Sequence, residues 1–298
     1  MKRIVICLLC LLLLCGCGKK PNEKTSSKLT VVTTIYPLYD FARAVGGDNI
    51  DLKMLIKPGM EVHTYDPIPS DMMAIYDSDL FLYVGGESDN WVNTLCDSSN
   101  INDVALINEV SCHEEHDHHK HNHVDEHIWT SPDNAILMLE KIRDGLIKID
   151  DKNTNIYTEN CDTYIRKIKD ASVKIENAVS KSDSPFILVA DRFPFEYFAE
   201  KYDIEYEAAF DGCAISTDIS LKTMSRLSEI IKNRNIKTVF CTELSSKSIA
   251  NALSEEHNVE IIELHSAHNV TVDDFINGIT YIDIMYRNAT ALEGRLGV

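Results

Sequence analysis

The sequence lacks an apolar run of the length that a membrane-spanning helix needs. The run from Ile4 to Leu14 is shorter than the roughly 20 residues that cross a bilayer. No other segment is as apolar. The sequence therefore offers no segment for a helical membrane span.

Metal-binding and redox motifs built on cysteine pairs are also missing beyond residue 16. None of the cysteines there has C-x-x-C spacing, which excludes a paired-cysteine zinc site and a dithiol redox motif. The H-E-x-x-H motif of zinc proteases is absent as well. The cysteines in question are scattered, and their spacing leaves a disulfide open: Cys17, Cys96, Cys112, Cys161, Cys213 and Cys241.

Basic residues are scarce relative to acidic ones. The 298-residue chain has 29 Lys and Arg against 47 Asp and Glu, a formal net charge of −18. Such a field repels nucleic acid and attracts cations, so we expect no nucleic-acid partner. The length allows two domains with separate cores, and a hydrophobic content of 44% is typical of a globular protein.

The N-terminus has the pattern of an export signal. Lys2 and Arg3 precede the short apolar run, which is the arrangement of a secretory signal peptide. The run ends in Leu-Cys-Gly-Cys17, which resembles the lipobox of bacterial lipoproteins. We therefore expect a signal peptide at 1–16, a diacylated Cys17 on the outer face of the cell membrane, and a flexible lipidated tether over 17–28.

Histidine is concentrated between residues 112 and 129, where seven of the eleven histidines lie. Imidazole is the commonest transition-metal ligand among side chains, so this segment indicates metal binding. We interpret 113–123 as a polar loop that adds a secondary, weaker metal site through His113, His116, His118, His119, His121 and His123. His127 differs because Ile128 and Trp129 follow it, and we expect it to be held in a fixed position.

Apolar periodicity predicts two α/β lobes. Strand-like and helical segments alternate from residue 29 to 84 and again from 186 to 264, which favours mainly parallel sheets. Between them, 156–179 carries one apolar stripe at helical spacing and predicts a long helix. We expect an N-terminal lobe at 29–150, a rigid linking helix at 151–182 and a C-terminal lobe at 183–298. A last helix is predicted from Thr271, with Asp274 as its capping partner, through Met285.

Three motifs lie in an informative order along the chain. His63 falls in a loop after a predicted strand, where open α/β sheets place ligands. The motifs are His63-Thr64-Tyr65-Asp66-Pro67, Asp125-Glu126-His127-Ile128-Trp129-Thr130-Ser131-Pro132, and the segment from Phe195 through Tyr197 to Tyr202. In combination with the His-rich insertion, the chain resembles the zinc/manganese substrate-binding lipoproteins of ABC transporters, over essentially its whole mature length.

The resemblance implies one metal ligand in each of four loops, two from each lobe. His63 and His127 match directly. At the third position the chain has Arg192, which cannot ligate; either the adjacent Asp191 supplies an oxygen, or Asp191 pairs with Arg192 and a water ligates. At the fourth position we expect His265, which directly follows a strand, rather than His268.

The expected ligand set bears on the choice of metal. Three imidazoles with one oxygen favour zinc over manganese. Glu243 either orients His265 or caps a nearby helix.

The expected function is that of a monomeric zinc receptor without catalytic activity. It would capture Zn²⁺ outside the cell and deliver it to an ABC permease and its ATPase. The alternatives are a manganese receptor, a metal-binding adhesin or zinc buffer, and a zinc hydrolase, since three histidines with an open position are also used in catalysis.

Overall fold

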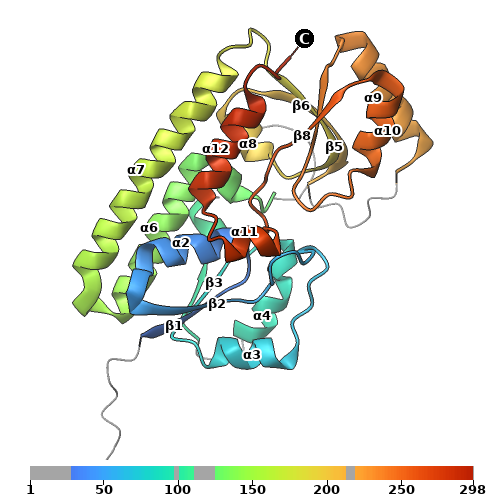
Figure 1. Cartoon of the computed structure of the whole chain (residues 1–298). Coiled ribbons are helices and arrows are strands. Elements are labelled where there is room, and N and C mark those ends of the chain that lie inside the picture. Colours follow the sequence, from blue (N-terminus) through green and yellow to red (C-terminus); the bar gives the residue numbers. More distant parts are fainter. Residues whose placement is uncertain (1–27, 97–100, 111–124, 213–218, 298) are drawn as a thin grey trace, which may run out of the picture.

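Two four-stranded parallel sheets form the frame of the protein (Figure 1). The computed structural model describes residues 28–96, 101–110, 125–212 and 219–297. The N-terminal sheet has the order β2-β1-β3-β4, and the C-terminal sheet has the order β6-β5-β7-β8. The strands are β1 (Leu29–Thr33), β2 (Ile50–Met54), β3 (Leu80–Tyr83), β4 (Asp103–Ala105), β5 (Phe186–Phe193), β6 (Glu205–Asp211), β7 (Thr238–Cys241) and β8 (Glu260–Glu263).

The two sheets share one topology. In each, the first strand lies second in the order, so the chain moves outward to one side and then crosses to the other. Open parallel sheets bind ligands at this switch point, outside the carboxyl ends of the strands. The loops that follow β2, β5, β7 and β8 are therefore placed to form a site between the lobes.

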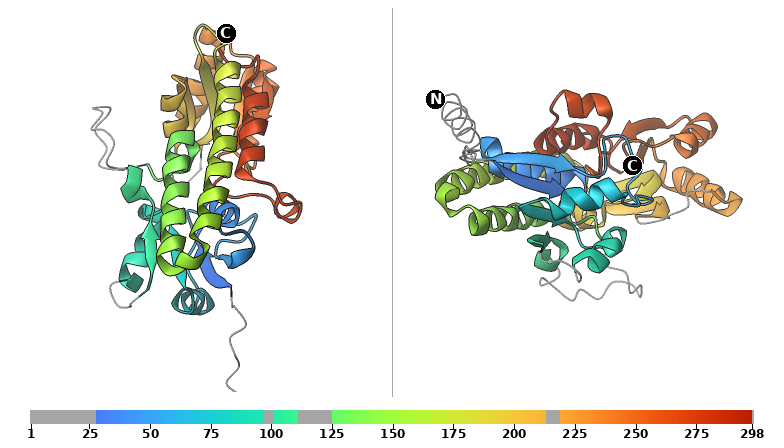
Figure 2. Two further views of the ribbon diagram at one scale, coloured as in Figure 1. Left: turned by 90° about the vertical axis from the view of Figure 1, so that its left-hand side faces the viewer. Right: turned by 90° about the horizontal axis from the view of Figure 1, so that it is seen from below.

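A 26-residue helix, α7 (Thr154–Val179), runs along both lobes (Figures 1 and 2). Its buried stripe includes Tyr157, Ile165 and Ile175. Three helices pack against it: α2 (Tyr36–Gly46), α6 (Pro132–Ile149) and α12 (Tyr281–Leu292). The other α-helices are α3 (Pro69–Tyr76), α4 (Asn90–Cys96), α5 (Ile107–Val110), α8 (Glu196–Lys201), α9 (Leu221–Arg234), α10 (Ser248–His257) and α11 (Val272–Ile276).

The predicted fold class of two α/β lobes with a long linking helix is confirmed. The prediction of a single last helix is wrong, because the chain forms two helices, α11 and α12, in its place. Gly278 adopts a left-handed φ of 73°, which ends the first helix, and Thr280 then caps the second by accepting a bond from the Asp283 backbone N–H. The short elements β4, α4 and α5 were not predicted.

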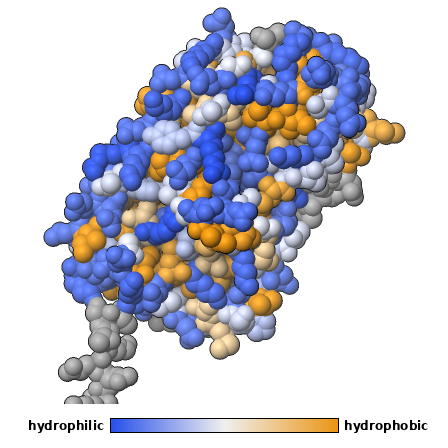
Figure 3. Space-filling model, in the orientation of Figure 1, coloured by the Kyte–Doolittle hydropathy of each residue, from blue (hydrophilic) through white to orange (hydrophobic). Residues whose placement is uncertain are grey.

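The hydrophobic core is continuous across the lobes. Its largest cluster joins residues of both sheets, such as Val31 and Val189, to the apolar stripe of α7. The face seen in Figure 3 is mainly hydrophilic, with hydrophobic side chains in separate patches. Among the helices of the described segments, none combines the length and apolar character needed to cross a membrane.

A buried carboxylate fixes the junction of three helices. Asp40 of α2 is fully buried and accepts hydrogen bonds from Arg43, from the Tyr164 hydroxyl on α7, and from the Tyr281 backbone N–H at the start of α12. Burial raises the pKa of Asp40, while Arg43 and the hydrogen bonds oppose that rise. This carboxylate therefore links the N-terminal lobe to the linking helix and to the C-terminal helix.

Replacing Asp40 should test how much this junction stabilises the fold. Asp40→Ala removes the acceptor that these three donors share, so we expect a loss of about 3–5 kcal/mol in the free energy of unfolding. Urea denaturation followed by circular dichroism measures it. The control is Asp48→Ala at an exposed site, which should change stability by no more than about 0.5 kcal/mol. Equal effects of the two changes would contradict a structural role for Asp40.

Candidate metal centre

Three histidines from separate segments converge between the lobes. One ring nitrogen from each of His63, His127 and His268 lies within 4.8 Å of the others. The ring centroids are 5.8 Å apart for His63 and His127, 5.0 Å for His63 and His268, and 4.9 Å for His127 and His268. His63 lies in the loop after β2, His127 precedes the short 3₁₀ helix Ile128–Thr130, and His268 lies in the loop after β8.

Hydrogen bonds between the lobes bring these loops together. The side-chain amide of Asn269, next to His268, donates to the carbonyls of Lys57 and Met60 at 3.0 and 2.8 Å. Both carbonyls belong to the loop that carries His63. The two histidine loops are thus fastened to each other by groups adjacent to the ligands.

A buried tryptophan makes the second connection. The indole N–H of Trp129 donates to the Ser266 carbonyl at 2.8 Å, and the Trp129 carbonyl accepts from the Tyr281 hydroxyl at 2.6 Å. The indole also packs against the rings of His127 and His268, with centroid distances of 5.4 and 4.9 Å. Trp129 is fully buried, and its indole supports both histidine rings by packing against them.

Carboxylates fix the orientation of two of the rings. The Nδ1 atom of His63 lies 2.8 Å from a Glu61 oxygen, and that of His127 lies 2.5 Å from an Asp125 oxygen. An ionised carboxylate only accepts, so each ring in its neutral form would carry its proton on Nδ1 and offer the Nε2 lone pair. The bond with His63, followed by Arg192, lowers the pKa of Glu61 to about 2. Burial alone would raise the pKa of Asp125, but its bonds with His127 lower it.

The donor set fits a metal ion. The Nε2 atom of His63 is buried without a hydrogen-bond partner, and its side chain is only 9% exposed. A buried polar atom left unpaired is costly unless it meets a ligand. His268 is buried too, and desolvation, followed by His127, His63 and Arg192, lowers its pKa well below the usual value. The ring of His268 is therefore neutral, as a metal ligand must be.

The structure places His268, and not His265, in this cluster, contrary to expectation. The Nδ1 atom of His265 accepts a bond from the Ala267 backbone N–H at 2.9 Å, and its backbone N–H donates to Asn288. Ala267 has a left-handed φ of 62°, so the chain turns sharply between the two histidines. The turn, rather than proximity to the strand, decides which ring faces the cleft.

Glu243 supports this turn. Its carboxylate accepts bonds from the Ser266 hydroxyl, the Ser266 backbone N–H at 2.7 Å and the His268 backbone N–H at 3.1 Å. The distance from Glu243 to the His265 ring is 3.6 Å, and the facing nitrogen already accepts a bond. Glu243 thus orients the loop of His268 rather than the ring of His265.

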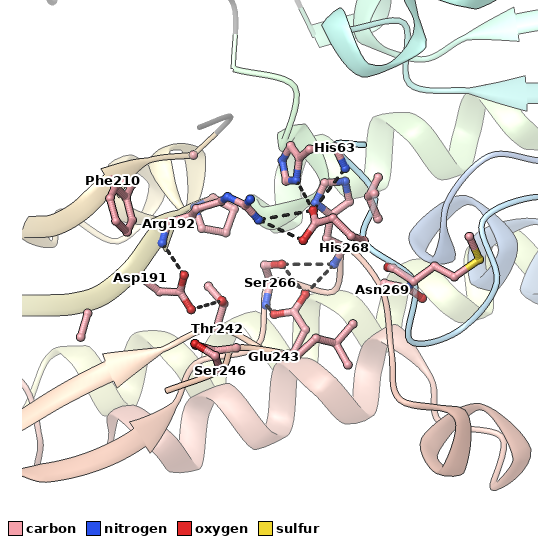
Figure 4. A pocket seen from close by; sticks show the side chains of 18 of the residues that line it. His63, Asp191, Arg192, Phe210, Thr242, Glu243, Ser246, Ser266, His268 and Asn269 are labelled. Carbon is pink, nitrogen blue, oxygen red and sulfur yellow. Dashed lines mark hydrogen bonds and ion pairs between the residues drawn. The ribbon is translucent and has the colours of Figure 1, made fainter. Parts of the chain in front are cut away.

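Asp191 lies beside the cluster but outside the group of converging ligand atoms. Its oxygens accept bonds from the Arg192 backbone N–H at 2.8 Å and the Thr242 hydroxyl at 2.9 Å. The Arg192 guanidinium reaches across to Glu61. A cavity of about 300 Å³ opens here, lined by Asp191 and Arg192 together with His63 and His268 (Figure 4).

The family model for the zinc-uptake complex component A periplasmic protein, ZnuA, matches residues 31–294. The chain belongs to the ZnuA family. Among curated proteins, this ZnuA-family chain is 29% identical to the zinc-binding lipoprotein AdcA of Streptococcus pneumoniae R6, over 98% of the chain but 61% of AdcA. It is 28% identical to the high-affinity zinc uptake system protein ZnuA of Bacillus subtilis 168, over 96% of the chain and 95% of that protein.

A solved structure agrees with this assignment. The Zn(II)-bound ZnuA-like domain of Streptococcus pneumoniae AdcA superposes with a TM-score of 0.77 at 27% identity, covering 90% of this chain and 99% of that domain.

Cys17 and the His-rich segment 113–123 of the present ZnuA-family member lie outside the described residues.

Buried acids hold the backbone beside His127. Asp89 accepts bonds from the backbone N–H groups of Val84 and Gly85 at 2.9 and 3.1 Å. Glu126 accepts bonds from the hydroxyl and backbone N–H of Ser88, which joins this turn to the residue before His127. Burial, and then the charge of Glu126, raises the pKa of Asp89 to about 6.

Removing the charge of Asp89 should therefore stabilise the protein at neutral pH. Its pKa is raised above the ordinary 3.8, so ionisation costs stability as the pH rises through about 6. Asp89→Asn keeps an acceptor, and we expect a gain of about 1–2 kcal/mol at pH 7.5 that shrinks between pH 6 and 4. Urea unfolding at several pH values measures the gain. A gain that does not vary with pH would show that the charge is not its source.

Proposed function

We propose that this protein is an extracytoplasmic zinc receptor that binds one Zn²⁺ between its lobes through His63, His127 and His268. The observation that supports it best is the convergence of three imidazoles, two of them buried and two of them held by carboxylates in the ligating tautomer. Carboxylate–histidine pairs of this kind are typical of protein zinc sites.

The donor atoms favour zinc over manganese. Three nitrogens match the tetrahedral preference of zinc and leave one position, whereas manganese prefers oxygen ligands in higher number. Asp191 lines the adjacent cavity and is the candidate for this fourth position, with a water as the alternative. AdcA is named a zinc-binding lipoprotein and the Bacillus subtilis relative a protein of a high-affinity zinc uptake system, and both names agree with this choice.

We further propose that the bound ion is handed to an ABC permease with its ATPase for uptake, and that the protein acts as a monomer without a catalytic step. The name of the Bacillus subtilis relative, a protein of a high-affinity zinc uptake system, supports this role. The arrangement of the proposed site supports this role too. Its ligands come from both lobes, so separation of the lobes would break the coordination and release the ion.

A matched pair of variants tests the zinc site. His268→Asn should weaken zinc binding by more than about 100-fold, because a direct bond is lost, a larger effect than loss of an orienting group. His265→Asn should change it by less than threefold, because the amide oxygen can replace Nδ1 as acceptor for the Ala267 N–H. Competition with a chromogenic chelator measures both affinities. The opposite order would assign the ligand to His265.

We propose that Cys17 carries the lipid that attaches the protein to the membrane. The basis is the Leu-Cys-Gly-Cys17 sequence, and the curated AdcA relative is named a lipoprotein. Cys17→Ser should abolish incorporation of labelled fatty acid and shift the protein from the membrane fraction to the medium or to an uncleaved precursor. Undiminished labelling would exclude Cys17 as the acceptor.

The His-rich segment stays a prediction. We propose that the six histidines between 113 and 123 bind further zinc more weakly than the site between the lobes, because ordering a polar segment around each ion costs conformational entropy.

A further inference from the structure

An arginine of one lobe holds an acid of the other at the edge of the histidine cluster. Arg192 lies near the end of β5, and its Nη1 donates to both oxygens of Glu61 at 3.2 and 3.3 Å (Figure 4). Glu61 belongs to the N-terminal loop that carries His63. The pair therefore spans the boundary between the lobes, and both residues line the cavity beside the cluster.

The same Glu61 carboxylate binds His63. One oxygen lies 2.8 Å from the ring Nδ1 and accepts a bond from the His63 backbone N–H at 3.3 Å. The contacts thus form a continuous series from the Arg192 guanidinium through Glu61 to the ring of His63. The ring is fixed from a lobe to which it does not belong.

Glu61 needs such a partner to stay in place. Its side chain is 48% exposed, and a glutamate free to rotate loses side-chain entropy when it is held in one rotamer. The Arg192 side chain is only 17% exposed and is always charged, so it restrains the carboxylate firmly. Without it, Glu61 would bind the His63 ring only part of the time.

We propose that Arg192 is a positioning residue for metal capture: through Glu61 it holds the His63 ring in the ligating orientation only while the lobes are together. This role rests on the proposed zinc site. Since Arg192 and His268 both come from the C-terminal lobe, separating the lobes removes one ligand and releases the orientation of another. Zinc affinity would then fall by more than it would through loss of the His268 ligand alone.

A double-mutant cycle tests the proposal with Arg192→Gln, Glu61→Gln and the two combined. Zinc affinity is measured by chelator competition, and ligand geometry by the visible absorption of the Co²⁺-loaded protein. Arg192→Gln should weaken zinc binding about 10- to 30-fold and alter the Co²⁺ spectrum, in the range typical of groups that orient a ligand. In the Glu61→Gln background, the same change should have less than a twofold effect. Arg192→Lys should recover most of the affinity.

The control and the contrary results are specific. Arg234→Gln removes an ion pair with Glu205 in the same lobe, outside the cavity lining, and should leave affinity and spectrum unchanged. Equal effects of Arg192→Gln in both backgrounds would show that it does not act through Glu61. Tighter binding in Arg192→Gln would show that the guanidinium only repels the cation.

Failure of the underlying zinc site would look different. If the wild-type protein has no tight zinc site, or if His63→Asn binds zinc as the wild type does, the proposed function fails and this role with it. Tight binding that is lost in His63→Asn but unchanged in Arg192→Gln would overturn the role of Arg192 alone.

Discussion

The hydrogen bonds that fasten the His268 loop to the N-terminal lobe are the constraint on which the site depends. Its three imidazoles come from two lobes, so their geometry is only as accurate as the alignment of those lobes. The linking helix and the buried Asp40 set this alignment at the scale of whole elements. Asn269 and the indole of Trp129 complete it within one or two residues of the ligands. The positions of the ligands therefore cannot change independently of the alignment of the lobes.

The sequence predicted the features that depend on local pattern. Alternating apolar segments identified two lobes, and the apolar Ile128 and Trp129, from which a fixed His127 is predicted, are both fully buried. The choice between His265 and His268 was not predictable in this way, because it depends on the left-handed turn at Ala267 and on its support by Glu243. For the break in the last helix, Gly278 is itself a local signal, but the helical spacing of the apolar residues outweighs it in the prediction.

The orienting carboxylates show a signal that sequence reasoning missed. Glu61 and Asp125 each lie two residues before a histidine of the cluster, and each accepts from that ring's Nδ1. An acid at this spacing before two separate histidines marks them as oriented rings. The partner of Glu61 could not be found by such a rule, because Arg192 lies 131 residues away and meets it only through the packing of the lobes.

The place of Trp129 gives the protein a built-in optical reporter. The chain has two tryptophans, both among the described residues, and Trp129 packs on two rings of the histidine cluster. A divalent ion arriving there would be the largest local charge beside the indole and would shift the energy of its excited state. Trp91 packs against Tyr65 and Phe81 instead. If the proposed site takes up its ion, intrinsic fluorescence should report the occupancy of the cleft in real time and without a dye.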